Sequence, residues 1–184
     1  MVFFGYQILF PRWQKETKKF VWPGLQVKRT KQYNRGVYAT QFLPSGTLIP
    51  YLGRVLTRKQ VEKERPCFEY LFREKSDTYL DGNPAYDQYN LFITSLINEP
   101  DFRQHSNMTM IYQRGDSPGS FLMVIQDISP GEQLTWHYGD LYLRKRYKVG
   151  RSGKIPPHLP HYYLTLKEKD NIKYQKLRQL TQFR

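Results

Sequence analysis

The chain has 184 residues, 39% of them hydrophobic, and a formal net charge of +13. Its single cysteine, Cys67, excludes an internal disulfide framework and a four-cysteine zinc site. No stretch approaches the roughly 20 apolar residues that span a bilayer. The apolar start of the chain also lacks the basic residues and the cleavage site of a signal peptide. We therefore expect a soluble, intracellular protein without membrane contact.

The basic charge is concentrated at the two ends of the chain. Residues 1–31 carry seven Lys/Arg and one acid, residues 144–184 carry twelve and two, and residues 32–143 have a net charge of −3. Basic flanks attract phosphate, and a mildly acidic centre attracts a basic peptide. The same flanks are equally compatible with a role in solubility alone. Contact with DNA or RNA through the flanks is therefore one of two open interpretations.

The first half of the chain predicts short strands separated by turns. A turn at residues 22–24 is followed by apolar residues whose alternation predicts two strands, joined by another turn, within residues 25–39. A further strand is expected at residues 47–53. Residues 1–24 are aromatic and basic, and we expect them to form an N-terminal extension. Their apolar run at residues 3–10 predicts either a strand added to the core or the interface of a homodimer.

Residues 57–72 are the best helical candidate, with Thr57 as the N-cap and Pro66 as the point where the helix ends or restarts. Later in the chain we expect strands at 78–80, 121–128 and 132–139, a strand or short helix at 91–98, and mostly loop at 99–120. Many short strands, with turns about every 8–12 residues, predict a mainly β fold with a few short helices. Residues 143–184 are expected to form a basic, partly helical extension.

Three stretches of sequence carry the functional signal. Residues 34–40 (NRGVYAT) contain Gly36, the residue type needed where the backbone approaches a ligand closely, and Asn34, which tolerates a positive φ. Residues 97–100 (INEP) supply Asn98, whose amide offers both a donor and an acceptor. Residues 131–140 (GEQLTWHYGD) place a tyrosine after a run that a Pro-Gly turn introduces.

In this order, the three stretches resemble the SET-domain protein-lysine methyltransferases over about residues 25–142. Asn34 takes the place of the first glycine in the family's Gly-x-Gly stretch, and residues 51–53 resemble its Tyr-x-Gly element. Asn98 matches the family's asparagine, although the two residues after it differ. The final stretch is the strongest match, with His137 where the family often has Asp. Without a cysteine-rich tail, the chain is most similar to the compact SET proteins of large DNA viruses and some bacteria.

The resemblance implies a SET-domain fold, in which several small sheets surround a knot-like C-terminal segment. It also implies methyl transfer from S-adenosylmethionine, with S-adenosylhomocysteine as the product, to a lysine of a basic protein such as a histone. The implied site residues are the catalytic Tyr138, the lysine-channel residues Tyr51, Tyr79 and Trp136, and the cofactor-binding residues Arg35, Gly36, Tyr38, Asn98 and Tyr142.

Core filling is the competing interpretation for each of these aromatic residues, and only for Tyr138 does the sequence favour function. No metal is expected, because the histidines show no ligand spacing with Cys67. A homodimer is compatible with the family, and a viral source would place the protein in the host nucleus or cytoplasm. The alternative function is binding of nucleic acid or nucleosomes by a catalytically weak SET core.

Overall fold

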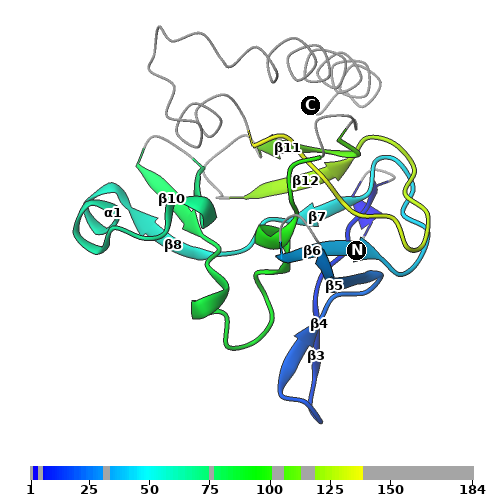
Figure 1. Cartoon of the computed structure of the whole chain (residues 1–184), viewed down its shortest axis with the longest axis horizontal. Helices are drawn as coiled ribbons and strands as arrows, with labels where there is room; N and C mark the ends of the chain where they lie inside the picture. The colour runs from blue at the N-terminus through cyan, green and yellow to red at the C-terminus, as the bar shows by residue number, and fades with distance from the viewer. Residues whose placement is uncertain are drawn as a thin grey trace, which may run out of the picture.

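The computed structural model describes residues 2–3, 6–30, 34–74, 77–100, 106–112 and 119–138. This part of the chain is mainly β, as predicted, with short strands in several small sheets and few helical turns (Figure 1). The expected extension at residues 143–184 lies outside the described residues. In the described part, the helices are too short or too polar to cross a membrane.

The strands in chain order are β1 (Val2–Phe3), β2 (Tyr6–Gln7), β3 (Arg12–Gln14), β4 (Lys19–Val21), β5 (Leu25–Thr30), β6 (Asn34–Ala39), β7 (Leu48–Pro50), β8 (Arg54–Thr57), β9 (Leu71–Arg73), β10 (Thr78–Asp81), β11 (Met108–Tyr112) and β12 (Ser120–Val124). The helices are α1 (Arg58–Glu64) and the 3-10 helices η1 (Phe68–Tyr70), η2 (Pro84–Tyr86) and η3 (Ile93–Leu96).

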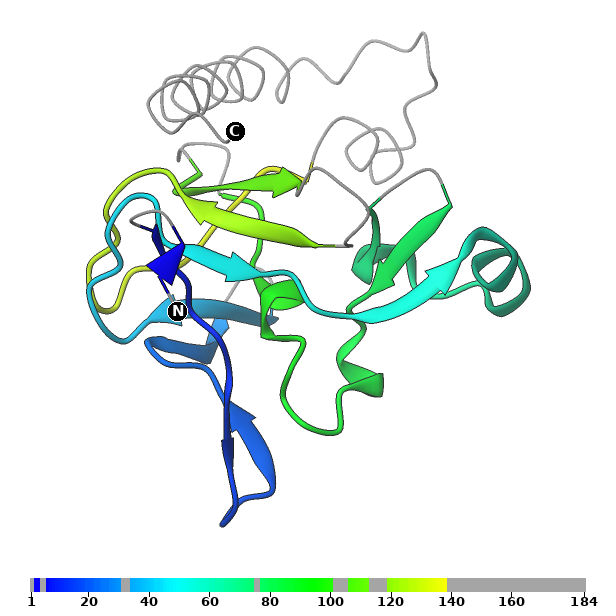
Figure 2. The same ribbon diagram turned by 180° about the vertical axis from the view of Figure 1, so that it is seen from behind.

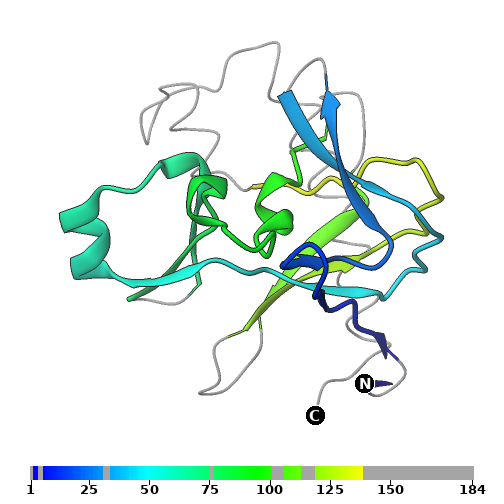
Figure 3. The same ribbon diagram turned by 90° about the horizontal axis from the view of Figure 1, so that it is seen from below.

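All sheets of the described region are antiparallel. Two have three strands, in the orders β11-β12-β7 and β8-β10-β9, and three are pairs: β1-β2, β3-β4 and β5-β6. Seen from below, the unit containing α1 and β8 lies apart from the strands β7 and β12, with the green 3-10 turns between them (Figure 3). The β5-β6 pair confirms the two strands predicted between residues 25 and 39.

Helix α1 begins where the sequence predicts and ends before Pro66, but the far part of the predicted helical range, up to residue 72, forms the 3-10 helix η1 and the start of strand β9. The Thr57 hydroxyl accepts a hydrogen bond from the Gln60 backbone N–H at 3.3 Å, and the Gln60 side chain accepts one from the Thr57 N–H at 2.8 Å. This reciprocal pair is a capping box. The helix ends at Arg65, whose φ is 48°, directly before Pro66. No residue of α1 is buried, and the capping box satisfies N–H groups at its start that have no partner within the helix.

An ion pair anchors β8 to β10. Asp81 is completely buried, and its carboxylate accepts hydrogen bonds from Arg54 Nη2 at 2.6 Å and from the Asn83 N–H at 3.0 Å. The hydrogen bond with Asp81 raises the pKa of Arg54 above its ordinary value. Arg54 also lies over the ring of Tyr86, 3.9 Å from its centroid. A buried carboxylate is tolerated only when it is paired in this way, so the pair fixes how β8 and β10 meet.

The apolar start of the chain packs on the body. Ile8 forms a parallel bridge with Leu48 of β7, and the Leu9 N–H donates to the Leu48 carbonyl at 2.9 Å. Leu9 is 5% exposed and belongs to the main core, together with the buried ring of Trp22. These contacts agree with the prediction of an added strand. They also show that part of the expected N-terminal extension contributes to the core.

One strand was missed and one predicted strand was wrong. Much of residues 99–120 was expected to be loop, and within this range the structure adds the strand β11, which pairs with β12 along its whole length. Residues 132–139 were expected to form a strand, but the described part of this range forms single bridges, from Gln133 to Tyr38 and from Thr135 to Asn98. Because its partners come from two separate segments, no continuous ladder forms.

Candidate active site

Two segments that are far apart in the sequence lie side by side, next to β11. Residues 97–99 run parallel to residues 133–138, and we call this pair of segments the crossing. The Trp136 N–H donates to the Asn98 carbonyl at 3.1 Å. The Tyr138 hydroxyl donates to the Ile97 carbonyl at 2.7 Å, and the Tyr138 N–H donates to the Glu99 carboxylate at 3.1 Å. Tyr138 is thus held at both its backbone and its hydroxyl.

A buried asparagine clamps the second segment of the crossing. Asn107 Nδ2 donates to the Gln133 carbonyl at 2.8 Å, and Asn107 Oδ1 accepts from the Thr135 N–H at 2.8 Å. Met108 at the start of β11 adds a backbone hydrogen bond to the Thr135 carbonyl at 3.0 Å. The β11-β12-β7 sheet therefore positions the segment that carries Trp136 and Tyr138.

Aromatic rings gather at the 136–138 end of the crossing. The Trp136 ring lies 5.1 Å from Tyr138, 6.3 Å from Phe72 and 6.4 Å from Tyr51, measured between centroids. Tyr51 and Phe72 are 5.2 Å apart. We call these four residues the aromatic cluster. It unites three of the predicted site residues and adds Phe72, which was expected at the end of the helical candidate 57–72 and which lies in β9.

Tyr51 is the most deeply buried phenol of the aromatic cluster, with 7% of its surface exposed. Burial, and secondly the negative charge of Asp81, raise the pKa of Tyr51 well above the ordinary tyrosine value. Its hydroxyl therefore stays protonated at physiological pH. It is suited to hydrogen bonding and apolar packing, and it cannot act as a phenolate base.

Tyr79 and its neighbour Leu80 lie on opposite faces of β10. Its register partners are Leu56 and Arg73. Neighbouring side chains on a strand point to opposite faces, and Leu80 packs into the core that contains Tyr51 and Trp136. The assignment of Tyr79 to a lysine channel stays a prediction.

Small and amide-bearing residues gather at the other end of the crossing. A Cβ added to Gly36 would lie 2.7 Å from Gln133 Nε2 and 3.0 Å from Asn98 Nδ2. Asn98 Nδ2 donates to the Arg35 carbonyl at 2.7 Å, and the Tyr38 hydroxyl donates to Gln133 Oε1 at 3.2 Å. We call Gly36, Tyr38, Asn98 and Gln133 the polar cluster. A side chain at this position would have to displace these two amide groups, and glycine leaves them undisturbed.

Four of the predicted cofactor residues thus come together: Gly36, Tyr38 and Asn98 within the polar cluster, and Arg35 through its carbonyl. The Arg35 side chain is exposed. Asn34 has a φ of 63°, as its place before Arg35 and Gly36 predicted. Gln133 was missed, since a single glutamine before a leucine gives no signal of such contacts. Tyr142 lies outside the described residues.

A buried acidic residue lies next to the aromatic cluster. Glu74 is 9% exposed, and its Oε1 accepts a hydrogen bond from the Ser120 hydroxyl at 3.1 Å. The Ser120 carbonyl in turn accepts from the Tyr51 N–H at 2.8 Å. No hydrogen-bond partner of Glu74 Oε2 occurs within the described ranges. The sequence gave no indication of this residue.

Within the described ranges, no cluster of three or more His, Cys, Asp or Glu side chains could hold a metal ion. Cys67 is a free, exposed thiol.

The fold and the crossing define the class of protein, and comparison with known families agrees. The family model described as "SET domain" matches residues 34–139, so the chain belongs to the SET-domain family. Among curated proteins, it is similar to "Histone-lysine N-methyltransferase Set8" of Drosophila melanogaster, with 29% identity over 128 residues. The protein of the same name from Drosophila pseudoobscura pseudoobscura is 28% identical over 128 residues. Both matches cover 64% of this chain but 18% of the relative, so the chain spans less than a fifth of their length.

Proposed function

We propose that this chain is an S-adenosylmethionine-dependent protein-lysine N-methyltransferase. One observation carries the proposal: the Tyr138 hydroxyl is fixed on the Ile97 carbonyl, within the aromatic cluster and one residue from Asn98 of the polar cluster. The hydroxyl that would orient an amine is therefore held by the residue next to Asn98, whose amide suits a cofactor. Family membership and the names of the two relatives support the same activity.

The aromatic cluster suits the activation of a lysine. A free lysine has a pKa of about 10.4 and is mostly protonated at neutral pH, so it must lose a proton before it can attack a methyl group. Aromatic walls disfavour the charged ammonium and favour the neutral amine. The hydroxyl of Tyr138 donates its proton to the Ile97 carbonyl, so toward an incoming amine its oxygen has the role of an acceptor of an N–H. Catalysis would then rest on alignment and electrostatics.

The polar cluster fits the amino-acid part of S-adenosylmethionine. Asn98 uses one of its amide protons on the Arg35 carbonyl, which leaves its second N–H for a carboxylate and its Oδ1 for an ammonium group. The absence of a Cβ on Gly36 keeps the backbone accessible beside these groups. When bound, the cofactor would supply an electrophilic methyl group on a sulfonium. Arg35, Gly36, Tyr38 and Asn98 are the residues that we propose to hold it, with Tyr142 as a further candidate.

We propose a basic protein, such as a histone, as the substrate. The mildly acidic centre of the chain attracts a basic peptide. Glu74, next to the aromatic cluster, adds an acidic group near the place where the lysine would enter. Tyr51, Tyr79 and Trp136 are the proposed walls of the lysine channel. A histone substrate would place the protein with chromatin.

The test is transfer of a radiolabelled methyl group from S-adenosylmethionine to core histones, to free histone-tail peptides and to proteins of a whole-cell extract. The full chain should label at least one lysine-containing substrate, and mass spectrometry of that substrate would identify the modified lysine. The matched negative control is Tyr138→Phe, which removes one oxygen atom and keeps the ring. Absence of transfer to histones, histone-tail peptides and extract proteins alike, or full activity of the control, would contradict the proposal.

Two further proposals follow from the charge and from the apolar N-terminal residues. The alternative function is binding of nucleic acid or nucleosomes by a catalytically weak SET core, and it predicts salt-dependent binding without methyl transfer.

Self-association as a homodimer is tested by light scattering across a range of concentrations. A mass of twice 22.1 kDa would support the dimer.

A further inference from the structure

We infer that the β3-β4 hairpin is a binding arm for single-stranded nucleic acid, at a surface separate from the candidate active site. The hairpin projects from the body of the molecule, where β3 pairs only with β4 among the described strands (Figures 1 and 2). All residues from Arg12 to Lys19 are exposed. This inference does not depend on methyl transfer, because none of these residues contacts the aromatic or the polar cluster in the described structure.

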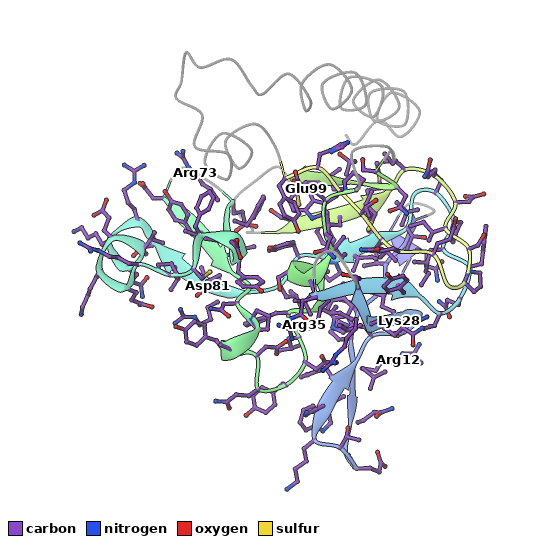
Figure 4. All side chains as sticks on the ribbon, in the orientation of Figure 1. Arg12, Lys28, Arg35, Arg73, Asp81 and Glu99 are labelled. Carbon is purple, nitrogen blue, oxygen red and sulfur yellow. The ribbon has the colours of Figure 1, made fainter. Side chains whose placement is uncertain are left out.

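The arm carries a strong and uncompensated positive charge. Arg12, Lys15, Lys18 and Lys19 are opposed within the arm only by Glu16. The exposed side chain of Lys28, on β5, continues this charge near Arg12 at the base of the arm (Figure 4). None of these cations forms an ion pair with an acid of the described residues. Such a surface attracts the phosphates of nucleic acid and repels the basic protein proposed as the substrate.

Exposed aromatic rings lie within this basic surface. Trp13 is 46% exposed, and its ring makes edge contacts with Phe20 at 5.1 Å and with Tyr89 at 6.0 Å. Tyr89 is itself 49% exposed. Large rings left open to solvent among Lys and Arg are the features on which unpaired bases stack. Bases in a duplex are already stacked on each other, so the rings favour a single strand over a double one.

The rings are held in place before any ligand arrives. The Phe20 N–H donates to the Tyr89 carbonyl at 2.8 Å, and Asn90 Nδ2 donates to the Phe20 carbonyl at 3.0 Å. The indole N–H of the buried Trp22 donates to the Asn90 carbonyl at 3.0 Å. Two residues before Tyr89, the carboxylate of Asp87 accepts hydrogen bonds from the backbone N–H groups of Leu91 and Phe92, at 2.7 and 2.6 Å. A fixed platform loses little conformational entropy on binding.

The test is fluorescence anisotropy of the full chain with a labelled single-stranded oligonucleotide and with a duplex of the same length, at several salt concentrations. We expect tighter binding of the single strand. Trp13→Ala should weaken it about tenfold, the scale of one lost base stack, with the salt dependence unchanged. The double variant Lys15→Gln/Lys19→Gln should lower the slope of log affinity against log salt by about 1.4, at roughly 0.7 for each phosphate contact.

Matched controls lie elsewhere on the surface. Phe42→Ala removes an aromatic side chain that is 54% exposed, and Lys59→Gln/Lys63→Gln removes the same charge from α1. Both controls should bind the single strand like the wild type, and circular dichroism and thermal unfolding should show all variants folded. Wild-type affinity of the arm variants, or equal losses in the controls, would overturn the inference. Tighter binding of the duplex, with Trp13→Ala harmless, would overturn the single-strand assignment.

Discussion

Aromatic rings occupy one end of the crossing, and small or amide-bearing residues occupy the other. At the 136–138 end, four rings pack against each other and the one fixed hydroxyl, that of Tyr138, is held by a backbone carbonyl. At the 133 end, Gly36, Asn98 and Gln133 approach so closely that an added methyl group would have to displace the Gln133 and Asn98 amides. Hydrogen bonds to the backbone hold both ends, yet one end provides an apolar surface and the other provides amides.

This difference separates two kinds of effect that a mutation can have. Changes at the aromatic end should alter the chemical step or the packing of the core. Changes at the polar end should alter the affinity for the cofactor. If the two ends acted as one undivided site, every substitution would change both quantities together.

The largest effect is expected for Tyr138→Phe. Loss of the hydroxyl removes the group that orients the amine, and the rate should fall at least about 10²-fold, as is typical for a positioned catalytic group. Steady-state kinetics with a labelled substrate should show the loss in kcat, with KM for the cofactor little changed. A loss confined to KM would mean that Tyr138 serves binding.

Trp136→Ala tests whether the aromatic cluster also stabilises the fold. Trp136 is 8% exposed and contacts three other rings. Truncation leaves a cavity and should lower the free energy of unfolding by about 3–5 kcal/mol. Urea unfolding followed by fluorescence and circular dichroism measures the change. Phe42→Ala, an exposed aromatic truncation, should cost much less, and an equal cost would contradict the assigned packing.

Gly36→Ala tests the close approach in the polar cluster. The new methyl group would push on the Gln133 and Asn98 amides, and cofactor affinity should fall about five- to tenfold, the scale of one disturbed hydrogen bond. In a Gln133→Ala background the nearest obstacle is gone, so the same change should cost less. Calorimetric titration of the cofactor into the wild type, the two single variants and the double variant gives the coupling energy between Gly36 and Gln133. Strictly additive losses of affinity would show that the two residues do not meet.

Tyr51→Phe should produce the smallest effect, visible only in alkali. Burial raises the pKa of Tyr51 above its ordinary value of 10.0, so the folded state binds the phenol proton more tightly than the unfolded state does. The contribution of this proton to the free energy of unfolding is complete below pH 10 and is lost as the pH rises further. The free energy of unfolding of the wild type should therefore fall by up to about 1.4 kcal/mol per pH unit more steeply than that of the variant. Urea unfolding at pH 8 to 11 measures both slopes, and parallel slopes would refute the burial of this phenol.

Local features of the fold could be predicted from the sequence. Thr57 and Pro66 marked the ends of α1, and the positive φ of Asn34 followed from the tolerance of asparagine for that conformation. Alternating apolar residues marked the β5-β6 pair. In each case the physical cause lies within a few residues of the effect, so the sequence contains all of it.

Features that depend on distant partners could not be predicted in the same way. Residues 132–139 have the alternation of a strand, but their hydrogen bonds go to three other segments, through Val37, Asn98 and Asn107. Gln133 and Phe72 gained their roles only from contacts with residues at least 20 positions away. The resemblance to a known family supplied Tyr138 and Asn98, which composition and periodicity would have left among many similar residues.

The most direct test of the division between the two ends is a calorimetric titration of S-adenosylmethionine into the wild type, Tyr138→Phe and Asn98→Ala. We expect Tyr138→Phe to bind the cofactor within about twofold of the wild type, and Asn98→Ala to bind about tenfold more weakly. Unchanged affinity of Asn98→Ala together with a large loss in Tyr138→Phe would contradict the account.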